Sequence, residues 1–238
     1  ASSEKEFGGQ EYVEIDGRRV NTSLAMLTNP LSATGEAYRR LRTNLRFAQP
    51  DPPTRSLVVT SPTKGEGKTT TATNLAIALA QSGQKTLLVD ADLRKSRLHR
   101  YFDVPRTPGL TEALYDPPDP SDLPSPADNL WLIPGGEEVP NPAELLGAQR
   151  MRALLERMEG TFDRVVVDTA PILLFNDPAA LATHADGVLL VAAANETDGP
   201  AVEQAAGLLD NVDAALLGAV LNRFRPDQQS GGYGYGYG

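Results

Sequence analysis

A glycine-rich turn between a β-branched run and an alanine-rich segment carries the residues with the clearest chemistry. The stretch VVTSPTKGEGKTT occupies residues 58–70 and ends with a lysine and two threonines. The backbone N–H groups of such a turn can surround a phosphate, the lysine can reach β- and γ-phosphate oxygens, and a threonine hydroxyl can hold Mg²⁺. The stretch therefore predicts a nucleotide site whose binding residues are Thr63, Lys64, Gly65, Glu66, Gly67, Lys68, Thr69 and Thr70.

One position departs from the usual phosphate-loop pattern. The motif G-x-x-x-x-G-K-[ST] begins with a glycine, whereas this sequence has Pro62 at that position. A purely structural turn is the alternative for a glycine-rich stretch taken alone. A strand, a turn and a helix in direct succession favour a nucleotide site.

Three aspartates follow two other hydrophobic runs. Asp90 and Asp92 stand at and just beyond the end of one run, TLLVDADLR, and Asp168 ends the run RVVVD. Ligands bind at the carboxyl ends of the strands in open α/β sheets, so we expect the three carboxylates to converge on Lys68 and Thr69. Each aspartate alone would be interpreted as a loop or helix cap. Together they offer the hard oxygen ligands that Mg²⁺ prefers and a base for phosphoryl transfer.

Six short hydrophobic runs predict the strands that position these residues. They cover residues 56–61, 85–90, 129–134, 164–169, 187–193 and 215–222, and all six are expected to be fully buried. Helix-patterned segments lie at 69–82, 142–158 and 200–212; Asn141, Pro142 and Glu144 predict the N-cap, first turn and capping box of the second. This alternation predicts an α/β domain, doubly wound, with a mainly parallel sheet and helices on both faces.

Composition predicts the domain boundaries. The first 30 residues are polar with little periodicity, so residues 1–30 are expected to form an arm on the surface or a partly disordered segment. A helix capped by Thr34 should run to about Ala48, inside a folded domain that spans 31–225. Residues 226–238 end in GGYGYGYG and predict a flexible, tyrosine-rich tail.

Charge and composition exclude several classes of function. The 238-residue chain has a formal net charge of −9 and a pI near 4.8, which argues against binding to nucleic acid as its main function. It has no cysteine, and His99 and His184 are too few for a histidine metal cluster. The longest apolar run, 188–194, is far shorter than the ~20 residues of a membrane span. We expect a cytoplasmic location.

The order of motifs along the chain resembles that of the bacterial tyrosine kinases of capsule and exopolysaccharide biosynthesis. The matching segments are GEAYRRLRTNLRFA, the Walker A stretch above, the Walker A′ stretch LLVDADLRKSRLHRYF, GLTEAL, IPGG, NPAELL and the Walker B stretch FDRVVVDTAP. The resemblance implies a P-loop NTPase fold of the deviant Walker A class. It also implies ATP/ADP and Mg²⁺ as cofactors, and phosphate transfer from ATP to protein tyrosine.

The resemblance gives roles to individual residues. Lys68 and Thr69 would serve the ATP phosphates and magnesium, and Asp92 and Asp168 would hold the metal ion or its waters. Asp90 would be the base that accepts the proton of the tyrosine hydroxyl, although Asp92 is interchangeable with it at the level of sequence. Lys68, Asp90 and Asp92 are therefore the expected catalytic residues.

The tail also gains a role from this resemblance. Asn222, which ends the last predicted strand, would contact the adenine base; in the simpler interpretation it caps the strand end. A tail that begins beside the site can reach an active site in the same subunit or in a neighbour. We expect autophosphorylation of Tyr233, Tyr235 and Tyr237 in trans, with each phosphate adding about −1.5 to −2 charges.

A charged stripe on the first long helix suggests self-association. Glu36, Arg39 and Arg42 are spaced three apart and share one outward side, which in most helices is a solvated surface. In the resembled family the E-x-x-R-x-x-R pattern is an oligomerisation motif that helps to build a homo-oligomeric ring, such as an octamer. The resemblance further implies a phosphotyrosine phosphatase and a membrane activator, or polysaccharide co-polymerase, as partners. The activator would be a separate protein or an amino-terminal part of a longer chain, and would hold the kinase at the inner face of the plasma membrane.

Two other functions are compatible with the sequence. A septum-site or plasmid-partition ATPase switch shares the fold and the loop, but its signature lysine would stand at Thr63, and Lys64 is one place away. A non-catalytic regulator would use its nucleotide only to control docking to a polysaccharide-export membrane protein. The complete set of Lys68, Thr69 and the three aspartates favours a transferase.

Overall fold

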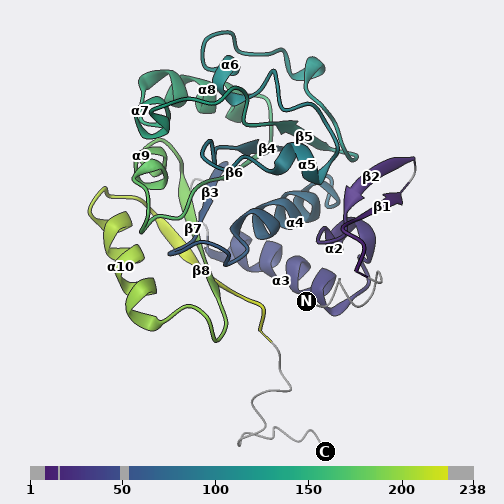
Figure 1. The fold of residues 1–238 in the computed structure, drawn as a ribbon, viewed down its shortest axis with the longest axis horizontal. Coiled ribbons are helices and arrows are strands. Elements are labelled where there is room, and N and C mark those ends of the chain that lie inside the picture. Colours follow the sequence, from purple (N-terminus) through teal and green to yellow (C-terminus); the bar gives the residue numbers. More distant parts are fainter. Residues whose placement is uncertain (1–8, 16, 49–53, 225–238) are drawn as a thin grey trace, which may run out of the picture.

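Six parallel strands form a central sheet in the order β5-β4-β6-β3-β7-β8 (Figure 1). The computed structural model describes residues 9–15, 17–48 and 54–224. The sheet strands are β3 (Ser56–Thr60), β4 (Thr86–Asp90), β5 (Leu130–Ile133), β6 (Arg164–Asp168), β7 (Gly187–Ala193) and β8 (Leu216–Asn222). The helices are α2 (Ala25–Thr28), α3 (Ala33–Ala48), α4 (Lys68–Ala80), α5 (Leu98–Tyr101), α6 (Leu110–Ala113), α7 (Pro142–Leu146), α8 (Gln149–Glu159), α9 (Asp177–Ala182) and α10 (Gly199–Asp210), with a 3₁₀ turn at Pro120–Asp122.

Helices cover both faces of this sheet because successive residues of each strand point to opposite sides. On β3, Val58 belongs to a hydrophobic core shared with α6 to α10. Its neighbours Leu57 and Val59 belong to a second core, shared with α2 to α5. Figure 1 shows the purple and blue helices on one side of the sheet and the green ones on the other. The predicted doubly wound α/β fold is confirmed.

The strands lie where the hydrophobic runs predict them, but β8 is more exposed to solvent than predicted. β8 pairs only with β7 and forms an edge of the sheet. Its side chains are therefore covered less well than those of the inner strands, and Leu216 and Leu221 are 39% and 57% exposed. The prediction that residues 215–222 are fully buried is wrong.

The segment 142–158, expected to be one helix, contains two. α7 and α8 are separated by Gly147 and by Ala148, whose backbone is extended. Pro142 occupies the first turn of α7 as predicted, but the Asn141 side chain makes no capping bond to the helix. The Asn141 amide instead lies 3.4 Å from the Glu144 carboxylate. The capping-box prediction is therefore wrong.

The amino-terminal region packs on the domain, contrary to the expected surface arm. β1 (Tyr12–Ile15) and β2 (Arg18–Asn21) form an antiparallel hairpin. After the hairpin, Leu24 and Met26 are 0% and 1% exposed, within the core that contains α4. The Met26 N–H donates to Asn74 of α4 at 3.0 Å. The described residues before position 30 therefore include part of the core.

Helix α3 (Ala33–Ala48) begins two residues earlier than expected. The Ser32 hydroxyl accepts the N–H of Gly35 at 3.1 Å, so Ser32 caps the helix and the prediction for Thr34 is wrong. Tyr38 and Leu45 of α3 are buried against α4, as an amphipathic helix requires. No helix in the described part of the chain, α3 included, is both long enough and apolar enough to cross a membrane.

Candidate active site

The phosphate loop connects β3 to α4 and needs glycine at two positions. Gly65 and Gly67 have φ angles of +86° and +92°, which side-chain-bearing residues rarely adopt. A Cβ on Gly67 would also lie 2.1 Å from the amide nitrogen of Asn222. Helix α4 begins at Lys68, so the positive end of its dipole lies at the loop.

The proline at position 62 fits this loop without disturbing it. Pro62 is buried, and its carbonyl accepts the N–H of Leu173 at 3.2 Å. The preceding carbonyl, of Ser61, accepts the N–H of Ile172 at 2.9 Å. These contacts join the phosphate loop to the loop after β6 through carbonyl groups, which proline retains.

Lys68 lies among carboxylates, as expected from the strand ends. Its Nζ is 2.7 Å from Asp92 Oδ2, 3.9 Å from Asp168 Oδ1 and 3.3 Å from the Thr69 hydroxyl. Burial acts to lower the pKa of Lys68, but the negative charges of Asp168 and Asp92 outweigh it and hold the pKa above its ordinary value. The lysine is therefore a fixed positive charge at the start of α4.

Asp90 is wholly buried at the end of β4. Its Oδ2 accepts bonds from the Ser96 hydroxyl at 2.8 Å and from the N–H groups of Arg97 and Leu98, each at 3.0 Å. Asp90 thereby holds the start of α5. Its Oδ1 is buried without a hydrogen-bond partner among the described residues. Burial raises the pKa of this carboxyl above its ordinary value.

Asp168 has a similar environment on β6, directly beside Asp90. It is 1% exposed, and burial raises its pKa to about 7 although Lys68 acts to lower it. Its Oδ1 is also buried without a hydrogen-bond partner within the described chain. Buried polar atoms of this kind are costly unless something binds them.

The oxygen atoms at this site suit a magnesium ion. Thr69, Asp92 and Asp168 offer hydroxyl and carboxylate oxygens, the ligands that Mg²⁺ prefers, and Asp168 Oδ1, which has no hydrogen bond among the described residues, is one of them. Among the described residues, no group of three or more acidic or histidine side chains is arranged to hold a metal ion on its own. A bound metal therefore needs oxygens from other sources, such as phosphate or water.

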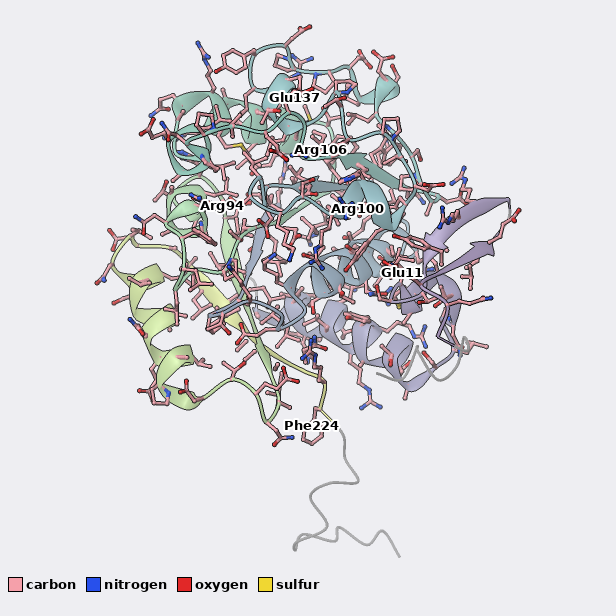
Figure 2. The ribbon with its side chains drawn as sticks, viewed as in Figure 1. Glu11, Arg94, Arg100, Arg106, Glu137 and Phe224 are labelled. Carbon is pink, nitrogen blue, oxygen red and sulfur yellow. The ribbon has the colours of Figure 1, made fainter. Side chains whose placement is uncertain are left out.

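Three loops of the site meet at Phe175, a contact that sequence reasoning missed. Arg94, from the loop after β4, makes a bidentate ion pair with buried Asp177 of α9, at 2.6 and 3.0 Å. The Arg94 guanidinium also lies 4.2 Å from the centre of the Phe175 ring, and Lys64 Nζ of the phosphate loop is 5.8 Å from it. Figure 2 shows Arg94 beside α9. An aspartate at the first position of a helix was the only signal for Asp177 in the sequence.

The end of β8 lies against the phosphate loop. The Asn222 amide donates to the carbonyl of Glu66 at 2.8 Å, so Asn222 belongs to the site, and its contact with adenine stays a prediction. The described chain ends at Phe224, at the lower end of the molecule in Figure 2. Tyr233, Tyr235 and Tyr237 lie outside the described residues.

The expected oligomerisation residues lie on α3, but they do not all point outward. Arg39 pairs with Glu36 at 2.9 Å and donates to the carbonyl of Pro30 at 2.8 Å. Arg42 donates to the carbonyl of Ala78, at the end of α4, at 2.9 Å. The expected outward position is therefore wrong for Arg42, which joins α3 to α4; a role of the stripe in oligomerisation stays a prediction.

Comparison with known proteins agrees with this geometry. The family model described as the CobQ/CobB/MinD/ParA nucleotide binding domain matches residues 57–232. The tyrosine-protein kinase YwqD of Bacillus subtilis (strain 168) is 38% identical over 221 residues, which cover 92% of this chain and 93% of YwqD. The tyrosine-protein kinase etk of Escherichia coli (strain K12) is 35% identical over 207 residues, but these cover only 28% of that longer protein.

A solved structure extends this similarity to the fold. The kinase domain of the Escherichia coli tyrosine kinase ETK superposes with a TM-score of 0.80 at 35% identity, over 90% of this chain and 85% of that domain. The ETK kinase domain therefore shares the fold of this chain as well as its sequence. The chain belongs to the bacterial tyrosine-protein kinases, within the CobQ/CobB/MinD/ParA family of nucleotide-binding domains.

Proposed function

We propose that this chain is a protein tyrosine kinase that uses ATP and Mg²⁺ to phosphorylate Tyr233, Tyr235 and Tyr237 of its own tail. The observation that carries the proposal is the position of Lys68, 2.7 Å from Asp92 and 3.9 Å from Asp168 at the start of the phosphate-loop helix. A fixed cation beside acidic ligands is what phosphoryl transfer requires.

The residues of the chain have separate tasks in this proposal. Bound Mg·ATP supplies the phosphoryl group, and Thr69, Asp92 and Asp168 would hold its metal ion. Lys68 neutralises charge on the phosphate oxygens. A bond forms between the tyrosine oxygen and the γ-phosphorus while the bond from that phosphorus to ADP breaks.

Asp90 accepts the proton that the tyrosine hydroxyl loses. Both oxygens of Asp92 are already used, Oδ2 by Lys68 and Oδ1 by the N–H of Lys95. Asp90 Oδ1 has no hydrogen-bond partner among the described residues, and burial raises the pKa of the Asp90 carboxyl, which favours uptake of a proton. We therefore assign the base to Asp90, and Asp92 keeps its tasks of holding Lys68 and the metal ion.

The tail reacts in trans within a homo-oligomeric ring, and its phosphorylation regulates synthesis or export of an exopolysaccharide. Glu36 and Arg39, at the surface of α3, support an interface there, and Arg42 supports it indirectly by fixing α3 to α4. The names of the relatives CapB, EpsB and CpsD support the polysaccharide link. The expected partners are a membrane activator, separate or fused, and a phosphotyrosine phosphatase.

Phosphotyrosine mapping of the full chain tests this function. After incubation with Mg·ATP, mass spectrometry should find phosphate on the tail tyrosines of the wild type. Lys68→Met should lower the rate by more than about 100-fold, because it removes the fixed charge. Lys85→Met, at an exposed lysine just before β4 and therefore at the opposite end of that strand from Asp90, is the matched control and should react normally. Hydrolysis of ATP without any phosphotyrosine would contradict the proposal and favour the partition-type ATPase.

A further inference from the structure

Four side chains hold the phosphate loop from the side of β8. Glu66 bonds to the Thr197 hydroxyl and to the N–H of Thr63. Asn222 and Arg223, at the end of β8, donate to the carbonyls of Glu66 and Gly65. We call Glu66, Thr197, Asn222 and Arg223 the loop clamp. It joins the phosphate loop, the loop between β7 and α10, and the end of β8.

Glu66 is buried in an otherwise exposed part of the loop. Thr63, Lys64 and Gly65 are exposed, whereas Glu66 is only 3% exposed. A buried carboxylate oxygen without a hydrogen bond is costly, and in Glu66 both oxygens are bonded: Oε2 accepts from Thr63 and Oε1 from Thr197. The side chain of Glu66 is therefore turned into the protein, where it fixes the loop.

The bond between Glu66 and Thr197 has a fixed direction. The Thr197 oxygen accepts the N–H of Ala193, at the end of β7, at 2.8 Å. Its hydroxyl proton is then directed to Glu66, because a carboxylate can only accept. Loss of the hydroxyl would leave Glu66 Oε1 buried without this donor, which is more costly than loss of an exposed bond.

Asn222 and Arg223 control where the loop N–H groups point. A peptide unit is planar and trans, so its C=O and N–H point in opposite directions. The carbonyl of Gly65 shares a peptide unit with the N–H of Glu66, and the carbonyl of Glu66 shares one with the N–H of Gly67. Bonds from Arg223 and Asn222 to these carbonyls therefore turn the two N–H groups away from β8. These are N–H groups of the kind that surround a phosphate.

We propose that Glu66, Thr197 and Arg223 are positioning residues that set the phosphate loop for the triphosphate before the nucleotide arrives. The inference rests on the proposed nucleotide site, but not on the identity of the phosphate acceptor. A preset loop loses less conformational freedom when the ligand binds, so the clamp acts on nucleotide affinity. It does not touch the reacting atoms. Changes to the clamp should therefore raise Kd and KM for ATP and leave kcat at saturating ATP nearly unchanged.

The decisive experiment measures Mg·ATP binding to the full chain by isothermal titration calorimetry, together with kcat and KM. Thr197→Val removes the hydroxyl and should raise Kd roughly 10-fold. Thr197→Ser keeps the hydroxyl and should restore the wild-type Kd. Thr183→Val is the matched control, because the Thr183 hydroxyl bonds to a carbonyl of its own helical turn, that of Ala180. Its Kd should equal that of the wild type.

A second variant separates positioning from stability. Arg223 is partly exposed, so Arg223→Ala should fold like the wild type and still raise Kd several-fold. If the wild type binds ATP and both Thr197→Val and Arg223→Ala bind it equally well, the inference is wrong and the nucleotide site stands. A fall in kcat with unchanged KM would also overturn it. Failure of the wild type to bind Mg·ATP would overturn the proposed function as well.

Discussion

At the scale of single residues, the site concentrates charge that the fold must hold out of water. Asp90, Asp92 and Asp168 lie around one cation, Lys68. Asp90 and Asp168 each keep one buried oxygen without a hydrogen bond among the described groups. Such a site costs stability in the free protein and gains interactions when ligand binds. The cost should be visible in the dependence of folding on pH.

The first prediction concerns Asp168. Its pKa is about 7 in the folded protein, against 3.8 for an ordinary aspartate. The folded state thus holds the proton more tightly, so this group lowers the free energy of unfolding as pH rises from about 4 to 7. The Asp168→Asn variant has no carboxyl group at this position, so it lacks this dependence on pH. Its free energy of unfolding relative to wild type should rise by up to about 1.4 kcal/mol per pH unit in that window and stay level above it.

Urea denaturation of both proteins with EDTA, at pH 5 and pH 8, measures this difference. EDTA keeps metal ions from binding Asp168 in the wild type. Asp163→Asn is a suitable control, because Asp163 lies at the opposite end of the same strand and its carboxylate accepts the N–H of Lys85 near the surface. A difference between Asp168→Asn and wild type that shrinks from pH 5 to pH 8 would contradict the assignment.

At the scale of elements, the amino-terminal region is a test of packing. Leu24 is fully buried in the core that contains α4, while Leu31, seven residues later, is 91% exposed. Leu24→Ala should lower the free energy of unfolding by about 2 to 5 kcal/mol, because it removes buried methyl groups and leaves a cavity. Leu31→Ala should change it by less than about 0.5 kcal/mol. Equal effects in urea denaturation would mean that residues before position 30 are not part of the core.

The elements also show what the sequence can predict. β3, β4 and β6 lie between two helical layers, so each is a continuous hydrophobic run. Such a run can be recognised as a strand in the sequence without knowledge of the strand order. The same holds for the phosphate loop, whose glycines, Lys68 and Thr69 are consecutive in the chain. The edge position of β8 depends on the strand order, so its partial exposure could not be predicted from a run that looks like the others.

Side-chain contacts between neighbouring strand ends could not be predicted from the sequence for the same reason. Glu66 and Thr197 are 131 residues apart, and Arg94 and Asp177 are 83 apart. Each pair forms because two strand ends happen to be neighbours, and neither residue carries a local pattern that names its partner. Asp90 was predicted to lie at the site, but its second role in holding α5 depends on the path of the loop between them.

At the scale of the whole molecule, the residues that precede the tail in the sequence contact the phosphate loop. Residues 222 and 223 hold the carbonyls of that loop, and the tail begins within a few residues of them in the sequence. The described chain therefore ends beside the site that is proposed to phosphorylate the tail tyrosines of another subunit. In a ring, all tails would meet in a confined region, and their charge would act on the assembly.

The last prediction follows from that charge. The chain has a net charge of −9, and phosphate on three tyrosines adds roughly −5 to −6 more per subunit at about −1.5 to −2 each. Repulsion between crowded tails should shift the phosphorylated protein toward smaller species in light scattering at low salt. The Debye length falls from about 10 Å at 0.1 M salt to about 3 Å at 1 M. Added salt should therefore screen the repulsion between the tails and restore the assembly. A variant with Phe at 233, 235 and 237 should keep its size after incubation with Mg·ATP. If it dissociates as the wild type does, the tail charge is not the cause, and phosphate elsewhere or the nucleotide itself must act on the α3 interface.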